Sequence, residues 1–146
     1  MRNRLFLIIV VISLLALVPA GLAGCGSKAT PTATATATVN NLSVADANTL
    51  IQKNANNPDF TIIDVRTQGE YQDGHIKDAI NIDVDSGSFK TDVSSLDTTK
   101  TYLVYCQTGV RSANASAQMV GLGFQHVYNM TGGISDWTAA GYPTTK

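Results

Sequence analysis

Short apolar runs alternate with amphipathic segments along the chain from residue 43 to residue 140. The apolar runs are rich in Ile, Val and Tyr, which is typical of strands covered on both faces. They lie at residues 60–65, 79–82, 101–105 and 126–130. Helical periodicity and capping residues, among them Ser43 and Gly123, predict helices at 43–53, 68–72, 89–96, 112–122 and 135–140. Because short strands alternate with helices, the sequence predicts an α/β fold with a mostly parallel sheet.

The first 25 residues have the composition of an export signal. Arg2 and Arg4 precede an apolar run of roughly 14 residues, which is shorter than the ~18 to 20 residues of a membrane-spanning helix. Small residues then precede Cys25, which resembles the lipobox of bacterial lipoproteins, where the cysteine is acylated. We therefore expect residues 1–25 to be a lipoprotein signal peptide and Cys25 the lipidation site. Either this anchor or an uncleaved one would tether the domain to a bacterial membrane, in the extracytoplasmic cell envelope.

A segment of Thr, Ala and Pro at residues 26–41 follows the leader and offers little to bury. It is predicted to be a flexible tether, so that residues 42–146 form the folded domain. About 105 residues suit one domain with one core. The formal net charge is −1, and the chain has no Lys/Arg cluster interleaved with aromatic residues. This composition argues against a nucleic-acid partner.

The predicted strand at 101–105 ends at Cys106, and Arg111 follows five positions later at an expected helix start. Gly109 allows the loop to turn, and the free N–H groups of the helix start would point at the sulfur. A helix N-terminus and a guanidinium both favour an anion, so Cys106 is predicted to be a solvent-reachable thiolate at neutral pH. The loop N–H groups are expected to bind an anionic substrate as a nest. The predicted substrate-binding residues are Gln107, Thr108, Gly109, Val110 and Arg111.

Several short motifs occur in the order seen in rhodanese-homology domains. They are Ile63-Asp64-Val65-Arg66, Glu70-Tyr71, Gly74-His75-Ile76, Ala79-Ile80-Asn81-Ile82, the loop from Cys106 to Arg111, and Gly132-Gly133-Ile134 with Trp137. The chain resembles this family over residues 42–142. The resemblance implies a single rhodanese-like domain, with a central sheet of about five short strands and helices on both faces. One departure is Lys77-Asp78, where many members have proline after the Gly-His-Ile turn.

The resemblance also implies a chemistry. In that family the cysteine attacks the outer sulfur of a donor such as thiosulfate, carries it as a persulfide and passes it to an acceptor such as cyanide or a thiol. It implies a sulfurtransferase with Cys106 as the catalytic residue, a small anionic donor, and no metal or cofactor. Arg111 would add a fixed positive charge beside the substrate, or would instead cap backbone carbonyls of the loop. If Cys25 is acylated, Cys106 is the only free thiol, so the acceptor must be external.

Other polar residues of the motifs are interpreted as structural. Asp64, Arg66 and Glu70 are predicted to support the loop, and Arg66 and Glu70, one helical turn apart, resemble the family's structural ion pair. His75 resembles a structural histidine of the Gly-His-Ile turn, because sulfur transfer through an ionised thiolate needs no general base. Trp137 is predicted to belong to the core.

Three other functions stay open. A non-enzymatic persulfide or sulfide carrier would use the same residues and differ only in turnover. A cysteine phosphatase resembles Cys-x5-Arg, whereas four residues separate Cys106 from Arg111, so this hypothesis is weaker. An inactive interaction domain is disfavoured because both residues are present.

Overall fold

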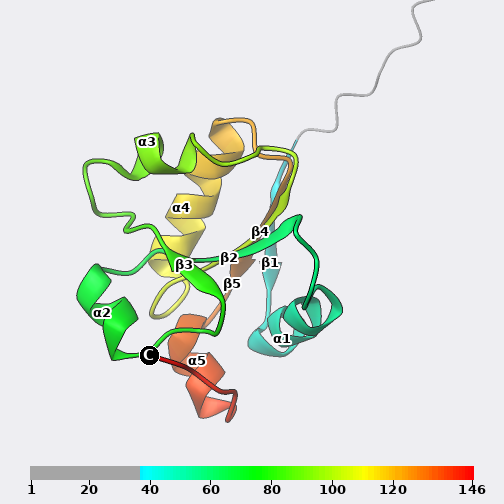
Figure 1. Cartoon of the computed structure of the whole chain (residues 1–146), viewed down its shortest axis with the longest axis vertical. Helices are drawn as coiled ribbons and strands as arrows, with labels where there is room; N and C mark the ends of the chain where they lie inside the picture. Colours follow the sequence, from blue (N-terminus) through cyan, green and yellow to red (C-terminus); the bar gives the residue numbers. More distant parts are fainter. Residues whose placement is uncertain (1–36) are drawn as a thin grey trace, which may run out of the picture. The chain divides into compact units, whose positions relative to one another are not determined.

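Five short strands form one parallel sheet in the computed structural model, which describes residues 37–146 (Figure 1). The strands are β1 (Val39–Leu42), β2 (Phe60–Asp64), β3 (Ala79–Asn81), β4 (Thr101–Tyr105) and β5 (His126–Met130). The helices are α1 (Val44–Lys53), α2 (Gln68–Asp73), α3 (Phe89–Val93), α4 (Val110–Gly121) and α5 (Gly133–Ala139). The strand order is β1-β5-β4-β2-β3, so β4 lies at the centre. The predicted α/β class, parallel sheet and number of strands are confirmed.

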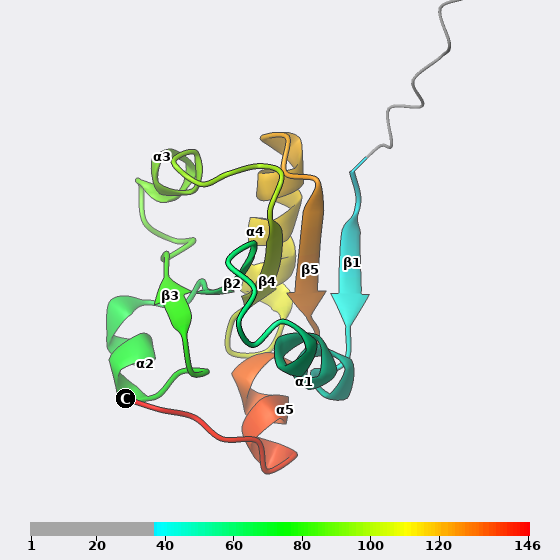
Figure 2. The ribbon, with the colours of Figure 1, turned by 45° about the vertical axis from the view of Figure 1, so that its right-hand side comes forward.

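Two apolar layers cover the two faces of this sheet. Successive side chains of a strand point to opposite faces. Ile63 and Val104 therefore pack with α3 and α4, whereas Ile62 and Leu103 pack with α1 and α5. Figure 2 shows α4 behind the sheet and α1 in front of it. Because both faces are covered, the central strands are apolar throughout, as the sequence pattern predicts.

The edge strand β1 corrects the predicted boundary of the tether. The segment Val39–Leu42 pairs in parallel with β5, with Asn41 opposite Asn129. The last three residues assigned to the tether therefore belong to the sheet. The segment is short and polar at Asn40 and Asn41, and its strand is fixed by backbone pairing with β5 rather than by burial of an apolar face.

The leader, with Cys25, and the tether residues 26–36 lie outside the described residues. Within residues 37–146, no helix is long and apolar enough to cross a bilayer. The longest element in that range is α4, with 12 residues.

Helix boundaries differ from the predicted ones by a few residues. The expected cap of α1 is confirmed, since the Ser43 side chain accepts a hydrogen bond from the Asp46 N–H. Gly123, at φ 96°, ends α4 in the left-handed region as predicted. The helix α4 begins at Val110 rather than at residue 112. Its first hydrogen bond runs from the Ala113 N–H to the Gly109 carbonyl, at 3.1 Å. The start of α4 is therefore closer to Cys106 than the sequence suggested.

Replacing Phe124 tests the layer that supports α4. Its ring is fully buried and meets the Tyr102 ring edge-on at 5.2 Å. We expect Phe124→Ala to lower the free energy of unfolding by about 3 to 5 kcal/mol, because it removes apolar contacts and leaves a cavity. Denaturant titration measures the change. The control Leu122→Ala removes a side chain that is 40 % exposed and should change stability by about 0.5 kcal/mol; equal losses would contradict the assignment of the core.

Candidate active site around Cys106

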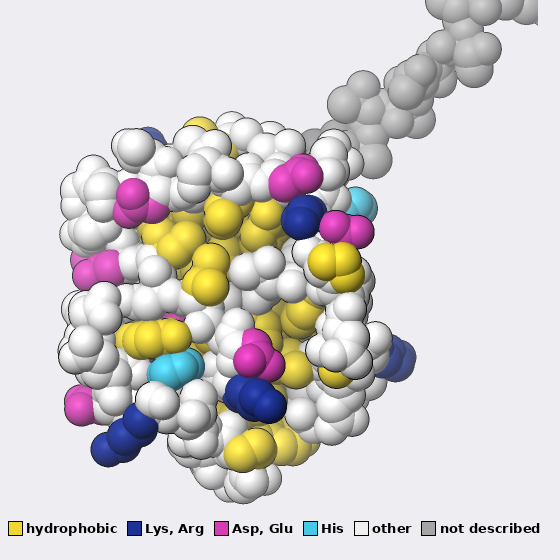
Figure 3. Space-filling view, in the orientation of Figure 1, with side chains coloured by type: hydrophobic (Ala, Val, Ile, Leu, Met, Phe, Trp, Pro, Cys, Tyr) yellow, Lys and Arg dark blue, Asp and Glu magenta, His cyan; other side chains and the backbone are white. Residues whose placement is uncertain are grey.

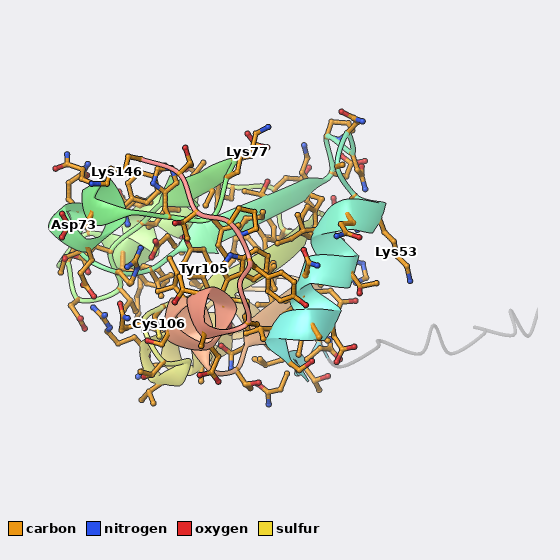
Figure 4. The ribbon with its side chains drawn as sticks, turned by 90° about the horizontal axis from the view of Figure 1, so that it is seen from below. Lys53, Asp73, Lys77, Tyr105, Cys106 and Lys146 are labelled. Atoms are coloured by element: carbon orange, nitrogen blue, oxygen red, sulfur yellow. The ribbon has the colours of Figure 1, made fainter. Side chains whose placement is uncertain are left out.

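The cysteine at the end of β4 is buried rather than exposed. Cys106 is 1 % exposed and belongs to the apolar layer under α4. Figure 4 shows Cys106 and Tyr105 at this end of the sheet, beside α5. The prediction of a solvent-reachable sulfur is therefore wrong for this conformation, because the loop that follows Cys106 folds back over the sulfur. The predicted position, at the carboxyl end of a central strand, is correct.

The start of α5 sets the conformation of this loop. The Ile134 N–H donates to the Cys106 carbonyl at 2.9 Å, and the Ser135 N–H donates to the Gln107 carbonyl at 3.0 Å. A trans peptide points its N–H opposite to its carbonyl. The Thr108 N–H therefore points away from α5 and toward the sulfur, and the Gly109 N–H donates to Cys106 Sγ at 3.1 Å. Two N–H groups of the predicted nest, those of Thr108 and Gly109, therefore donate to the sulfur itself.

Two glycines allow this close approach of backbones. A Cβ on Gly133 would lie 2.4 Å from the Cys106 carbonyl oxygen, and the residue has φ 60°. A Cβ on Gly109 would lie 3.0 Å from the Gly132 nitrogen, and that residue has φ 94°. Both positions therefore need glycine for space and for backbone conformation. The sequence motif contained Gly132 and Gly133, but only the structure shows what they touch.

The first turn of α4 adds further donors. Burial raises the pKa of the Cys106 thiol, but hydrogen bonds from the hydroxyl and N–H of Ser112 and from the Thr108 and Gly109 N–H groups outweigh it. The net effect is a lowered pKa. Ser112 Oγ lies 3.5 Å from Cys106 Sγ. Sequence reasoning missed Ser112, although its place directly after Arg111, in the first turn of a helix, was a usable signal.

Arg111 binds a carboxylate rather than the loop. Its guanidinium makes two hydrogen bonds to Glu70, at 2.7 and 3.0 Å, and lies 3.8 Å from Asp85. The proposed cap on backbone carbonyls is therefore not seen. The hydrogen bond from Arg111 lowers the pKa of Glu70 to about 2, further helped by bonds from Thr67. Thr67 and Glu70 form a capping box that holds this carboxylate toward the loop.

The predicted ion pair between Arg66 and Glu70 is wrong, because Arg66 pairs with Asp64 at 2.7 Å. Arg66 precedes α2, and its backbone N–H donates to Asp64 Oδ1 at 2.9 Å, which brings the two side chains together. Both side chains are buried, and Arg66 also donates to the Gly74 carbonyl at 2.7 Å and to Gln107 at 3.4 Å. Asp64 and Arg66 thus support the loop as predicted, but through a different partner.

The other motif residues have structural contacts. His75 Nδ1 lies 3.0 Å from the Tyr71 carbonyl. The His75 ring also stacks on the Tyr71 ring, with 3.7 Å between the ring centroids. Trp137 is buried and donates to the Pro143 carbonyl at 2.9 Å. In the Lys77-Asp78 turn, Asp78 has φ 64°, a left-handed conformation that is uncommon for a residue other than glycine.

Two cavities flank the loop. One, of about 240 Å³, lies between α2 and α5 and includes Arg66, Gln107 and Thr138 in its wall. The other, of about 330 Å³, includes Val110 and Arg111. A third cavity, of about 290 Å³ beside α1 and Phe60, lies toward the amino end of β2, away from the loop. Figure 3 shows apolar side chains within hollows of one face, with charged side chains of both signs scattered around them.

Comparison with known proteins now identifies the family. The family model of the rhodanese-like domain matches residues 46–140. This chain belongs to the rhodanese-like domain family. A curated relative from Allochromatium vinosum, named sulfurtransferase, is 31% identical over 98 residues, which cover 67% of this chain and 90% of that protein. A tRNA uridine(34) hydroxylase from Yersinia pestis is 36% identical over 86 residues, and the chain spans 24% of its length.

Solved structures agree with this assignment. The rhodanese-related protein of Thermoplasma volcanium is 31% identical, with a TM-score of 0.60, and the match covers 73% of this chain and 97% of that one. A protein from Rhodopseudomonas palustris, described as a possible tyrosine phosphatase, is 29% identical, with a TM-score of 0.58 over 73% of this chain and 85% of that one. The rhodanese-like fold is thus shared by proteins described with different activities.

Gly133→Ala tests the contact between α5 and the loop. The added Cβ would overlap the Cys106 carbonyl, and the left-handed backbone alone costs an alanine about 1 to 3 kcal/mol. We expect a loss of stability in denaturant titration and a raised pKa of Cys106, since the loop must move. Gly121→Ala is the control, because nothing lies within 4 Å of its Cβ; it should be neutral or stabilising by up to about 1 kcal/mol. Equal behaviour of the two variants would contradict the packing argument.

The ionisation of Glu70 makes the free energy of unfolding depend on pH in the acid range. Its pKa is lowered from 4.5 to about 2 in the folded protein, so the ionised form stabilises the fold above the unfolded-state pKa. This contribution is lost as the pH falls from 4.5 to about 2. We expect the free energy of unfolding to fall less steeply in this window for Glu70→Gln than for the native chain. Parallel pH curves from denaturant titrations at several pH values would contradict the assigned ion pair.

Proposed function

We propose that this rhodanese-like protein is a sulfurtransferase that carries sulfane sulfur as a persulfide on Cys106. The family and the relative named sulfurtransferase support sulfur transfer in general terms. The observation that carries the proposal is the hydrogen bond from the Gly109 N–H to Cys106 Sγ, within a loop whose other N–H groups lower the pKa of the thiol. A sulfur held in this way is a nucleophile without a general base.

The reaction has two steps. The Cys106 thiolate attacks the outer sulfur of a donor such as thiosulfate, and the sulfur–sulfur bond of the donor breaks. Sulfite leaves with the electron pair, and the new persulfide keeps one negative charge. A cyanide ion or an external thiolate then attacks the outer sulfur, and the electron pair of the broken bond returns to Cys106. Every species in this sequence is an anion, so donors fixed around Sγ serve both steps.

The loop would receive the outer sulfur and its charge. The N–H groups of Gln107 to Arg111, at the start of α4, would surround a sulfur bound to Cys106; the bond from the Gly109 N–H to Sγ supports this. The Arg111 guanidinium interacts electrostatically with Cys106 and supplies fixed positive charge. Because Cys106 is buried, the donor must approach past the loop, whose Val110 side chain is 75 % exposed. No metal or cofactor enters the mechanism.

The cellular setting is proposed from the leader. With Cys25 acylated, the protein would be anchored by lipid to a bacterial membrane, in the extracytoplasmic cell envelope. Cys106 would then be the only free thiol of the chain, since the sequence contains two cysteines. The acceptor must therefore be an external thiol, cyanide or a partner protein, and no internal disulfide forms.

A cysteine phosphatase is the second candidate, favoured by the structural neighbour described as a possible tyrosine phosphatase. Loop size argues against it. Four residues separate Cys106 from Arg111, one fewer than in the Cys-x5-Arg loop of those enzymes, and the Arg111 guanidinium is engaged by Glu70. The smaller ring suits a sulfur atom better than a tetrahedral phosphate. Sulfur transfer therefore fits the loop better.

Thiocyanate formation tests the function. We expect the purified chain to form thiocyanate from thiosulfate and cyanide, and Cys106→Ser to lose essentially all of this turnover because serine forms no persulfide. Hydrolysis of an aryl phosphate is measured beside it and should stay at background. If the chain gains the mass of one sulfur atom from thiosulfate but forms no thiocyanate, the result supports the alternative of a non-enzymatic persulfide carrier. Turnover that survives in Cys106→Ser would contradict the mechanism.

A further inference from the structure

A line of polar side chains leads from Cys106 to the edge of the sheet. Ser112 Oγ lies 3.5 Å from Cys106 Sγ and 2.7 Å from Asn129 Oδ1. Asn129 Nδ2 donates to Asn41 Oδ1 at 2.9 Å, from β5 to β1. Ser112 and Asn129 are 0 % and 2 % exposed, so their hydrogen bonds are made within the protein. Ser112, Asn129 and Asn41 all lie outside the loop from Gln107 to Arg111.

The Ser112 hydroxyl has one hydrogen and two neighbouring acceptors. The Asn129 amide group is oriented by its bond to Asn41, so that its oxygen faces Ser112. An uncharged sulfur is a weak acceptor, whereas a thiolate is a strong one. When the sulfur is uncharged, the Asn129 amide oxygen, 2.7 Å away, is the better acceptor for the Ser112 hydroxyl. The longer contact from this hydroxyl to Sγ becomes strong only when the sulfur is negatively charged. The direction of this one hydrogen bond therefore depends on the charge of Sγ.

We propose that Asn129 is a positioning residue for sulfur transfer: it accepts the Ser112 hydrogen bond whenever Cys106 Sγ is uncharged and releases it when the sulfur becomes anionic. The inference rests on the function proposed above. In the resting protein, Ser112 donates to the Sγ thiolate. In the persulfide, Sγ is the inner, uncharged sulfur, and the hydroxyl turns to Asn129. When the acceptor takes the outer sulfur, the electron pair returns to Sγ, and the hydroxyl turns back to stabilise the leaving thiolate.

Asn129 thus has two effects on the cycle. It holds the Ser112 oxygen close to the sulfur. In the persulfide state it also accepts the hydrogen bond of the Ser112 hydroxyl, because a buried hydroxyl without a partner would be unfavourable. The same competition favours the uncharged form of Cys106 over the thiolate. Removing the Asn129 amide should therefore lower the pKa of Cys106, which a role in packing alone would not do.

The charged groups already present near the site are the same in all the variants below. Arg111 of α4 interacts electrostatically with Cys106, and it is paired with Glu70 of α2 and lies near Asp85. The Asp64–Arg66 pair belongs to the opposite face of the sheet, since Asp64 follows Ile62 by two residues. A pKa difference between variants at Ser112 or Asn129 therefore reports on the hydrogen bond.

The test uses the full-length chain with Cys25→Ser, in which Cys106 is the only thiol. The ultraviolet absorbance of the thiolate gives the pKa of Cys106, and stopped-flow mixing gives the rates of sulfite release and of persulfide discharge to cyanide. We expect Ser112→Ala to raise the pKa by about one unit and to slow discharge roughly tenfold. Asn129→Leu should lower the pKa by about half a unit to one unit, but only while Ser112 is present.

Further variants secure the interpretation. If Asn129→Leu does not fold, Asn129→Asp takes its place: its carboxylate adds charge, so the rise in the Cys106 pKa is compared with and without Ser112 and should be larger while Ser112 is present. Asn114→Leu, on the exposed side of α4, is the matched control and should change neither the pKa nor the discharge rate. Melting curves verify that each variant is folded.

Three results would overturn the inference. They are an unchanged or raised pKa in Asn129→Leu, the same shift with Ser112 replaced by alanine, and a discharge rate that does not respond to Ser112→Ala. The pKa is measured without a sulfur donor, so it is independent of the proposed function. If the pKa shifts follow the prediction but thiosulfate leaves no sulfur on Cys106, the exchange of hydrogen bonds stands and its place in sulfur transfer is wrong.

Discussion

The constraint on which the site depends is that a thiolate on Cys106 would be almost fully buried. Burial disfavours the thiolate of Cys106, so donors must be fixed around it before any substrate arrives. The chain fixes them by directing the carbonyls of Cys106 and Gln107 into the start of α5, which turns the next N–H groups toward the sulfur. The glycine at 133 is required because these backbones touch. A short helix far along the chain thereby sets the surroundings of the sulfur at the end of β4.

The charged side chains around the site serve mainly to hold the loop. Arg111 is bound in two places by Glu70, and Arg66 joins Asp64 to the backbone of Gly74. Each cation is therefore paired, and the sulfur's strongest partners are neutral N–H and O–H donors. Such donors can stabilise an anion without an exchange of protons, which suits the proposed cycle, in which every species is charged. The proposed turn of the Ser112 hydroxyl between Sγ and Asn129 extends this principle by one further donor.

Much of the fold could be predicted because the apolar runs of the central strands follow from burial on both faces. The strand at 39–42 could not, since it is fixed by backbone pairing with β5. At the site, the spacing of Cys106 and Arg111 indicated the loop and its N–H groups. The burial of Cys106 and the roles of Ser112 and Asn129 depend on packing between distant segments, which one sequence does not show. The partner of Arg66 was misassigned because helical spacing was applied to a residue that precedes α2.

The most direct test of this account is the ionisation of Cys106 in the otherwise native chain, followed by the ultraviolet absorbance of its thiolate as the pH is raised. The geometry predicts a midpoint below the ordinary pKa of a cysteine thiol once the contribution of Cys25 is removed by a serine. A midpoint at or above that ordinary value would contradict the account, because the loop would then surround a protonated thiol.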